Sequence, residues 1–410
     1  MKNYVIIGNG TAAVGTIEGI RSVDKDGKIT VISAENRHVY CRPLISYLLE
    51  GKTDRKKMLY RPEDFYDRNC VEVLYGEKAA KLDPKAKAVT LESGKKLKYD
   101  AVCVATGSTP FVPPFDGLES VEKVHTFMTL DDADALEKDL APDAKVLIVG
   151  AGLIGLKCAE GILERCASVT VCDLAPRVLS SILDDDCAAI MQSHLEKMGV
   201  SFLLDDTAER FENGTAHMRS GKNVDFDVLV MAVGVRANIS LVKDAGGDCN
   251  RGVLTDDKMS TSLKDVYSAG DCTESYDITS DARKVMAIMP LAYMQGHCAG
   301  VNMAGGEESI QNALPMNSIG FAGLHCMTAG SYVGECYEEK TETTIKRLFT
   351  ENNVLKGFIL IGDTARAGIY TSMIRNKTPL DTVDFELLKK SPTLAPFGAV
   401  YRKEKLGGVV

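Results

Sequence analysis

The chain has 410 residues, 45% hydrophobic and 26% charged, which is enough for two or three folded domains and unlike a disordered chain. Its net charge of −9, with no long basic run, argues against a nucleic-acid partner. No apolar run could cross a bilayer, and residues 1–3 lead directly into a short strand pattern, so we expect a cytoplasmic protein with no membrane partner.

The first predicted unit opens with an apolar strand over residues 4–7, followed by the turn Gly8-x-Gly10-x-x-Ala13. A helical stretch then runs to about Arg21, and a second strand over residues 28–33 ends just before Glu35. The glycines permit a tight turn and let a pyrophosphate approach the N-terminus of the helix, while the acid can bind an adenosine ribose. The pattern therefore predicts a dinucleotide-binding βαβ unit.

A near copy of this unit begins at residue 145. A strand over residues 146–149 runs into Gly150-x-Gly152-x-x-Gly155, a helix follows to about Arg165, and a strand over residues 168–172 ends at Asp173. An acid at this position binds the ribose 2′-hydroxyl and repels a 2′-phosphate, which favours NADH over NADPH. Arg177 lies close enough in sequence to weaken that preference, unless it is simply a solvated surface arginine.

The remaining chain suggests how these units are bounded. Residues 99–107 and 226–234 share one pattern, an aromatic–Asp pair, an apolar strand and a glycine, and we expect each to close one of the two nucleotide-binding folds. A proline-rich linker spans residues 110–114. Beyond about residue 313, a hairpin pattern over residues 346–361 indicates a smaller C-terminal α+β domain. The predicted fold class is α/β, with two Rossmann-like domains and this third domain.

With both units in place, the chain resembles the FAD-dependent flavoproteins of the pyridine nucleotide–disulfide oxidoreductase superfamily over nearly its whole length. The resemblance rests on the two glycine motifs, on Ala105-Thr106-Gly107, and on residues 261–271, which are similar to the family's second FAD motif. Residues 40–47 and 355–363 look most like NADH:rubredoxin reductases and the FAD domain of nitrite reductases. The resemblance implies a discontinuous FAD domain (residues 1–114 and 238–312), an NAD(P)H domain (115–237) and a C-terminal domain (313–410).

The resemblance also implies a set of cofactor-binding residues. Asp271 is expected to bind the ribityl chain of the flavin, and the segment from Pro290 to Gly296 is expected to lie under it. The full predicted set for FAD is Gly8, Gly10, Thr11, Ala12, Ala13, Glu35, Arg42, Pro43, Ala79, Ala105, Thr106, Gly107, Gly270, Asp271 and Pro290. The set for the nicotinamide nucleotide is Gly150, Gly152, Leu153, Ile154, Gly155, Asp173 and Gly234.

Three departures from the family bear on the catalytic residues. The family's disulfide reductases carry a cysteine pair where this chain has only Cys41, so that thiol either has a redox role or simply packs. Tyr47 stands where many relatives have a lysine, and Lys157 where many have a glutamate. We expect Lys157 to stabilise the reduced, anionic flavin, with a surface lysine as the alternative, and Tyr47 to cover the ring.

Two nucleotide sites in one chain suggest a hydride donor and a hydride acceptor that meet face to face. We therefore expect an oxidoreductase that transfers hydride from NADH to FAD and passes electrons to a rubredoxin or iron–sulfur protein. Alternatives are an NADH oxidase, a disulfide or peroxide reductase that uses Cys41, and an electron-relay subunit of a larger complex. The 12 cysteines are scattered, so we expect no metal site. A homodimer remains open.

Overall fold

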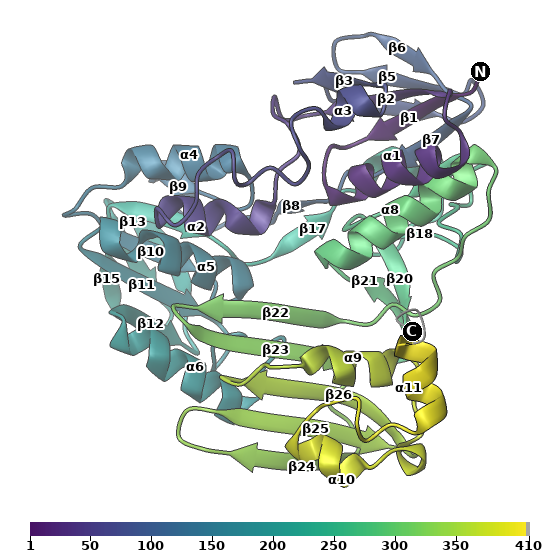
Figure 1. Ribbon diagram of the computed structural model, residues 1–410. Helices are drawn as coiled ribbons and strands as arrows, with labels where there is room; N and C mark the ends of the chain where they lie inside the picture. The colour runs from purple at the N-terminus through teal and green to yellow at the C-terminus, as the bar shows by residue number, and fades with distance from the viewer. Residues whose placement is uncertain (407–410) are drawn as a thin grey trace. The chain divides into compact units, whose positions relative to one another are not determined.

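The computed structural model describes residues 1–406, and the chain divides into two compact units (Figure 1). The first unit comprises Met1–Ser275 and Lys284–Ile310. The second comprises Tyr276–Arg283 and the chain from Gln311 onward. Both predicted strand–turn–helix–strand units are present and lie in the first unit, and the predicted hairpin lies in the second.

A five-stranded parallel sheet forms the base of the first nucleotide-binding fold. The four apolar residues of its central strand are all buried, as expected for a parallel sheet covered on both faces. In a parallel sheet all strands end at the same edge. Gly8 follows the strand Asn3–Ile7, Glu35 follows Lys28–Ser33 and Gly270 follows Val266–Ser268, so these three residues lie at that edge. In spatial order the strands are β19 (Val266–Ser268), β7 (Ala101–Val104), β1 (Asn3–Ile7), β2 (Lys28–Ser33) and β3 (Val71–Tyr75).

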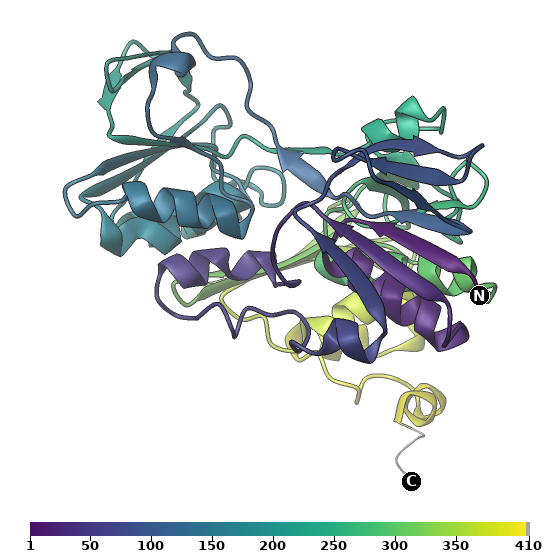
Figure 2. The ribbon, with the colours of Figure 1, turned by 90° about the horizontal axis from the view of Figure 1, so that it is seen from above.

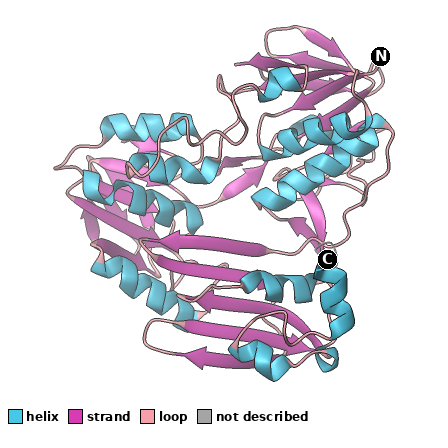
Figure 3. Cartoon of the chain, viewed as in Figure 1, coloured by secondary structure: helices cyan, strands magenta, loops and turns pink. Residues whose placement is uncertain are grey.

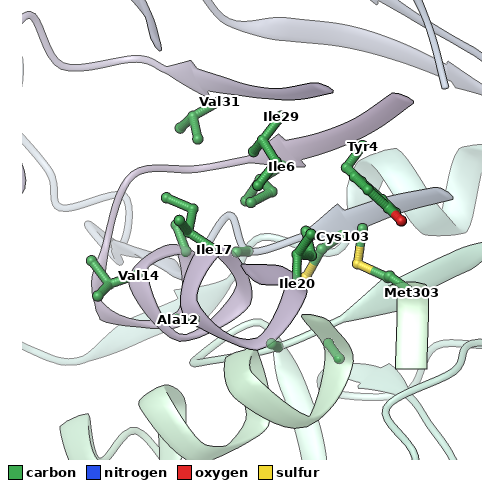
Figure 4. Packing of buried hydrophobic residues seen from close by; sticks show 14 of the residues in the cluster. Tyr4, Ile6, Ala12, Val14, Ile17, Ile20, Ile29, Val31, Cys103 and Met303 are labelled. Atoms are coloured by element: carbon green, nitrogen blue, oxygen red, sulfur yellow. The ribbon is translucent and has the colours of Figure 1, made fainter. Parts of the chain in front are cut away.

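Helix α1 (Thr11–Val23) packs against this sheet beside helix α8 (Met289–Ala304), which comes from far along the chain and also contacts the sheet (Figure 1). Val14, Ile17 and Ile20 of α1 are buried in one apolar cluster with residues of β1 and β2 (Figure 4). On its other side α1 meets α8 through glycines. A Cβ added at Gly15 would lie 2.2 Å from the carbonyl oxygen of Tyr293, and one at Gly300 would lie 2.2 Å from that of Thr16. The two helices are therefore in direct backbone contact.

The second nucleotide-binding fold has its own five-stranded parallel sheet. The short helix α2 (Ile45–Leu49) belongs to the segment after β2 but lies beside the helices of this second fold (Figures 1 and 2). In spatial order the strands are β12 (Val200–Leu204), β11 (Ser168–Asp173), β10 (Lys145–Val149), β16 (Val228–Met231) and β9 (Val124–His125). The helices are α4 (Leu130–Asp139), α5 (Leu153–Ile162) and α6 (Asp185–Lys197).

Smaller elements fill the connections between the larger ones. Two antiparallel three-stranded sheets are β4 (Ala79–Asp83), β5 (Ala88–Leu91) and β6 (Lys96–Lys98), then β13 (Ala208–Glu212), β14 (Thr215–Met218) and β15 (Asn223–Asp225). The remaining strands are β8 (Ser108–Pro110) paired with β17 (Val235–Ala237), and β18 (Val253–Leu254), β20 (Thr273–Asp277) and β21 (Ala282–Val285). The short helices are α3 (Phe65–Arg68) and α7 (Ser240–Asp244).

The second unit is built on a five-stranded antiparallel sheet (Figure 3). Tyr370 and Met373, on the apolar face of α9, are fully buried against this sheet with Phe358. The sheet order is β22 (Met316–Phe321), β23 (Leu324–Gly330), β26 (Val354–Ile361), β25 (Ile345–Glu351) and β24 (Glu335–Lys340). The helices are α9 (Ala367–Arg375), α10 (Phe385–Lys390) and α11 (Ala399–Leu406). The predicted hairpin over residues 346–361 is confirmed as β25 and β26.

Candidate active site

The turn between β1 and α1 has the geometry that a bound pyrophosphate needs. Gly8 has φ +118°, and a Cβ there would lie 2.1 Å from the carbonyl oxygen of Ala105, so only glycine fits. A Cβ at Gly10 would meet no atom within 4 Å. Helix α1 starts at Thr11 with no side-chain cap, which leaves the first N–H groups of Thr11, Ala12 and Ala13 for a ligand.

The carboxylate of Glu35 is held by two neighbouring side chains at the end of β2. Its two oxygens accept hydrogen bonds from the Tyr40 hydroxyl at 2.7 Å and from the Arg42 guanidinium at 2.6 Å. Tyr40 also accepts a hydrogen bond from the N–H of Leu130, the first residue of α4, at 2.8 Å. Burial and the bond to Glu35 raise the pKa of Tyr40, so its hydroxyl stays a donor. The sequence did not identify Tyr40 as a site residue, because its two partners, Glu35 and Leu130, lie far from each other in the chain.

Asp271 follows β19 and provides a carboxylate without a partner. Among the described residues it makes no hydrogen bond, and burial raises the pKa of its carboxyl group while the charge of Arg42 opposes the rise. A poorly solvated carboxylate of this kind is suited to accept a hydrogen bond from a ligand hydroxyl. Together with the open space at Gly10 and the uncapped α1, it shows that the residues present fit FAD.

The other residues predicted for FAD occupy varied positions. Thr106 and Asn238 exchange two hydrogen bonds of 2.9 Å, which join the end of β7 to the segment after β17. A Cβ at Gly107 would meet no atom within 4 Å. Pro290 lies in the first turn of α8, and Pro43 in a short 3₁₀ turn that precedes α2. The side chain of Ala79 packs against the apolar cluster beneath β4–β6, so any contact with FAD would come from its backbone.

The turn between β10 and α5 repeats the geometry of the first. Gly150 has φ +119°, and a Cβ there would lie 2.3 Å from the carbonyl oxygen of Ala232. A Cβ at Gly152 would meet no atom within 4 Å, whereas one at Gly155 would lie 1.9 Å from the carbonyl oxygen of Gly150. Helix α5 begins at Leu153 with no side-chain cap. Its first N–H groups, including those of Leu153 and Ile154, are therefore also left for a ligand.

Asp173 lies at the end of β11, with both oxygens bonded to backbone. They accept hydrogen bonds from the N–H of Ala151 at 2.6 Å and of Ala175 at 2.8 Å. The nearby Arg177 is engaged elsewhere. Its guanidinium donates to the carbonyl of Leu183 at 3.0 Å and pairs with Asp185 at 3.0 Å. These bonds engage the guanidinium of Arg177 with the segment at the start of α6. Gly234, with φ +121°, follows β16 at the same edge.

Cys41, Tyr47 and Lys157 were predicted near the flavin. Burial raises the pKa of the Cys41 thiol, which disfavours the nucleophilic thiolate. Lys157 lies over the Tyr47 ring, 4.5 Å from its centroid, and forms an ion pair with Glu160, whose side chain is only 3% exposed. The structure thus brings Lys157 and Tyr47 together across α5 and α2. Glu160 was missed, although its spacing of three residues from Lys157 on a helix is a usable signal.

All 12 cysteines lie within the described residues, and none forms a disulfide. Residues 1–406 contain no helix long and apolar enough to cross a membrane. In the same part of the chain, no group of three or more histidine, cysteine and acidic side chains is placed to hold a metal ion.

Comparison with known proteins identifies the class. The profile of the pyridine nucleotide-disulphide oxidoreductase family matches residues 2–296. The chain is 32% identical to the NADH oxidase of Methanocaldococcus jannaschii, covering 87% of each protein. It is 30% identical to the Bacillus subtilis nitrite reductase [NAD(P)H], over 92% of this chain but only 48% of that one. It therefore spans about half the length of that relative.

A third similarity combines sequence and structure. The chain is 27% identical to the NADH-rubredoxin oxidoreductase of Clostridium acetobutylicum over 80% of this chain and 82% of that protein. A crystal structure under that name and organism superposes with a TM-score of 0.76 at 23% identity, covering 93% of this chain and 97% of the other. The predicted fold class is confirmed. The chain belongs to the pyridine nucleotide-disulphide oxidoreductase family, and it is an NAD(P)H-dependent FAD oxidoreductase.

Proposed function

We propose that the enzyme oxidises NADH and delivers the electrons to a rubredoxin or other small iron–sulfur protein. The observation that carries the nucleotide preference is the arrangement at Asp173. Its carboxylate is fixed by two backbone N–H groups, and the nearest cation in sequence, Arg177, is engaged with Leu183 and Asp185. A fixed negative charge, with the guanidinium of Arg177 engaged by other partners, favours a ribose hydroxyl and disfavours a 2′-phosphate.

Two observations support the proposed electron acceptor: the state of the Cys41 thiol and the similarity to an NADH-rubredoxin oxidoreductase. A relay through a cysteine pair would need a dithiol, but Cys41 forms no disulfide in the structure, and a single-thiol relay is disfavoured because burial raises the pKa of the Cys41 thiol. This favours direct electron transfer from the flavin to the acceptor. The similarity to an NADH-rubredoxin oxidoreductase supports a rubredoxin-type acceptor. A bound flavin supplies the chemistry here, because it can accept a hydride and release electrons singly.

The chain's own residues then bind and orient. In this proposal the free N–H groups at the starts of α1 and α5 bind the two pyrophosphates, and the carboxylates of Glu35 and Asp173 bind the two riboses. Asp271 accepts a hydrogen bond from the ribityl chain. Domain borders at residues 114, 237 and 312, a cytoplasmic location and a homodimer stay predictions.

Lys157 is proposed to supply positive charge near the flavin, with Tyr47 covering the ring. The ion pair with Glu160 and the contact with the Tyr47 ring keep the ammonium between α5 and α2. A Lys157→Met substitution removes the charge but keeps most of the side-chain volume. We expect at least a tenfold slower hydride-transfer step in stopped-flow measurements, with FAD content unchanged. An unchanged rate would assign Lys157 a structural role only.

The central proposal is tested by anaerobic titration of the purified enzyme with NADH, and separately with NADPH, while the visible flavin band is followed. We expect NADH to bleach the band at one equivalent per FAD, and NADPH to do so only at much higher concentration. Consumption of a second equivalent of NADH would reveal another redox centre and favour a thiol mechanism. No bleaching with either nucleotide would contradict the proposal.

A second candidate is an NADH oxidase, which the 32% identity to the Methanocaldococcus jannaschii protein favours. Oxygen consumption with NADH, measured with and without added rubredoxin, separates the two functions. A Cys41→Ser substitution, which keeps the size of the side chain, then tests the single-thiol version. We expect unchanged turnover with either acceptor, and loss of turnover would establish a thiol step. The similarity to half of a nitrite reductase leaves a relay role in a larger complex as a further candidate, which co-purification of a metalloprotein would support.

A further inference from the structure

Gln295 lies in the middle of helix α8, and its side chain forms hydrogen bonds with two other segments of the chain. It is only 2% exposed. Its amide oxygen accepts a hydrogen bond from the N–H of Gly270 at 2.7 Å, and its amide nitrogen donates to the Ser275 hydroxyl. Gly270 directly precedes Asp271, and Ser275 lies in β20. One buried amide therefore connects α8 to both sides of the turn that carries the flavin-binding carboxylate.

The backbone of this turn has little other freedom. Gly270 has φ +83°, and a Cβ there would lie 3.0 Å from the Cβ of Ala12 in α1. Inside the turn, the hydroxyls of Ser268 and Thr273 are hydrogen-bonded at 2.7 Å. The carboxylate of Asp271 makes no hydrogen bond of its own with any described residue. Its direction is therefore set by the backbone on either side of it, and Gln295 bonds to that backbone.

We propose that Gln295 is a positioning residue for FAD, which acts by holding the turn from Gly270 to Ser275 so that Asp271 is presented to the ribityl hydroxyls. The amide suits this task because it offers one acceptor to an N–H and one donor to a hydroxyl. Both bonds are buried, so their loss leaves unsatisfied groups and allows the turn to relax. The inference rests on the proposed role of Asp271 in flavin binding.

The test is a double-mutant cycle on FAD affinity. The holoenzyme is diluted and FAD release is followed by flavin fluorescence, for the wild type, Gln295→Met, Asp271→Asn and the double variant. Gln295→Met keeps the side-chain volume but removes both bonds. We expect each single variant to raise the Kd for FAD by about tenfold. We expect the Kd of the double variant for FAD to exceed that of the weaker single variant by no more than about twofold, because both substitutions act through the same contact with FAD.

Two further variants complete the design. Gln295→Glu keeps the acceptor for the Gly270 N–H and replaces the donor by a second acceptor, to which the Ser275 hydroxyl can donate after rotation, and we expect it to bind FAD at least threefold more tightly than Gln295→Met. It also decides the question if Gln295→Met fails to fold. The matched control is Gln192→Met, which removes an amide on α6 that donates to Glu196 at 2.8 Å. We expect that variant to bind FAD as the wild type does.

The possible outcomes distinguish the role of Gln295 from the proposed role of Asp271 in flavin binding. Normal FAD affinity of Gln295→Met, or equal affinity of the Met and Glu variants, would overturn the role of Gln295 alone. Fully additive losses in the double variant would also overturn it, because Gln295 would then act independently of Asp271. Unchanged affinity of Asp271→Asn would instead remove the proposed role of Asp271 itself.

Discussion

The two nucleotide-binding folds share one turn geometry but hold their acids differently. Gly8 and Gly150 have φ values of +118° and +119°, and each lies against a carbonyl of the neighbouring strand's end. Glu35, however, is held by the side chains of Tyr40 and Arg42, whereas Asp173 is held by backbone N–H groups of its own unit. The same turn geometry is thus combined with an acid held by side chains in one fold and with an acid held by backbone N–H groups in the other.

This difference matches the two roles. The first site draws on several chain segments, including the turn at Gly270 and Asp271, to which Gln295 of α8 bonds through the N–H of Gly270. The second draws on one βαβ stretch and on the segment that follows β16, where the carbonyl of Ala232 lies against Gly150. A site closed by several segments is suited to retain a cofactor, while a local and simpler site is suited to a cosubstrate that must leave after each turnover.

Alanine at Gly8 or Gly150 should damage one fold and spare the other. In both positions the new Cβ would overlap a carbonyl oxygen at 2.1 Å or 2.3 Å, on a backbone with positive φ. We expect Gly8→Ala to cost about 3 kcal/mol or more in the free energy of unfolding and to abolish FAD retention. Gly150→Ala should keep its FAD but lose reduction by NADH. Flavin content and NADH titration measure this directly.

The control for these variants is Gly221→Ala. Gly221 also has a positive φ, +83°, but a Cβ there would meet no atom within 4 Å. It should cost only the conformational strain, about 1 kcal/mol, and leave both nucleotides bound. A comparable loss of FAD in this variant would mean that strain, not overlap with a neighbouring carbonyl, explains the effect at Gly8.

The second glycines should behave in the opposite way. A Cβ at Gly10 or Gly152 would meet no protein atom within 4 Å, so the fold should tolerate Gly10→Ala and Gly152→Ala with a change in Tm of a few degrees at most. Each should weaken only its own nucleotide, by about tenfold or more, because the methyl group occupies space next to the phosphate position. Wild-type affinity for both nucleotides in both variants would refute the assignment of these turns.

Asp173→Asn should change the choice of nucleotide. The amide cannot accept from both backbone N–H groups in the same way, and it removes the charge that disfavours a 2′-phosphate. We expect the ratio of kcat/KM for NADH over NADPH to fall by about tenfold or more. The control is Asp227→Asn, which removes a carboxylate that accepts from the Lys145 N–H at 2.8 Å at the opposite end of β10. An unchanged ratio in Asp173→Asn would leave the NADH preference without its cause.

Tyr40→Phe should have the smallest effect of these variants. It removes the hydroxyl that donates to Glu35 and accepts from Leu130, so we expect the Kd for FAD to rise by about fivefold and the Kd for NAD⁺ to stay constant. Tyr370→Phe is matched to it, because that buried hydroxyl donates to the carbonyl of Leu388 at 2.7 Å in the second unit. The control should lower Tm without altering FAD affinity. Equal effects on FAD would point to general destabilisation.

Much of this arrangement follows from sequence, because the residues concerned are neighbours in the chain. The glycine turns, both acids and the hairpin of β25 and β26 follow local patterns that persist after folding. The long-range contacts could not be predicted in that way. Tyr40 reaches Leu130, and Gln295 reaches Gly270, only once the elements have packed. The environment of Arg177 likewise depends on the path of the backbone to α6.

The contact between α1 and α8 places a condition on the order in which the protein can be assembled. Gly15 and Gly19 of α1 lie against carbonyl oxygens of α8, and Gly296 and Gly300 of α8 against those of α1. Helix α1 ends at Val23 and α8 begins only at Met289, so the surface that completes α1 is synthesised long after α1 itself. A nascent chain that ends before α8 exposes one side of α1 to water. The first nucleotide site is thus complete only after the second fold has already been synthesised.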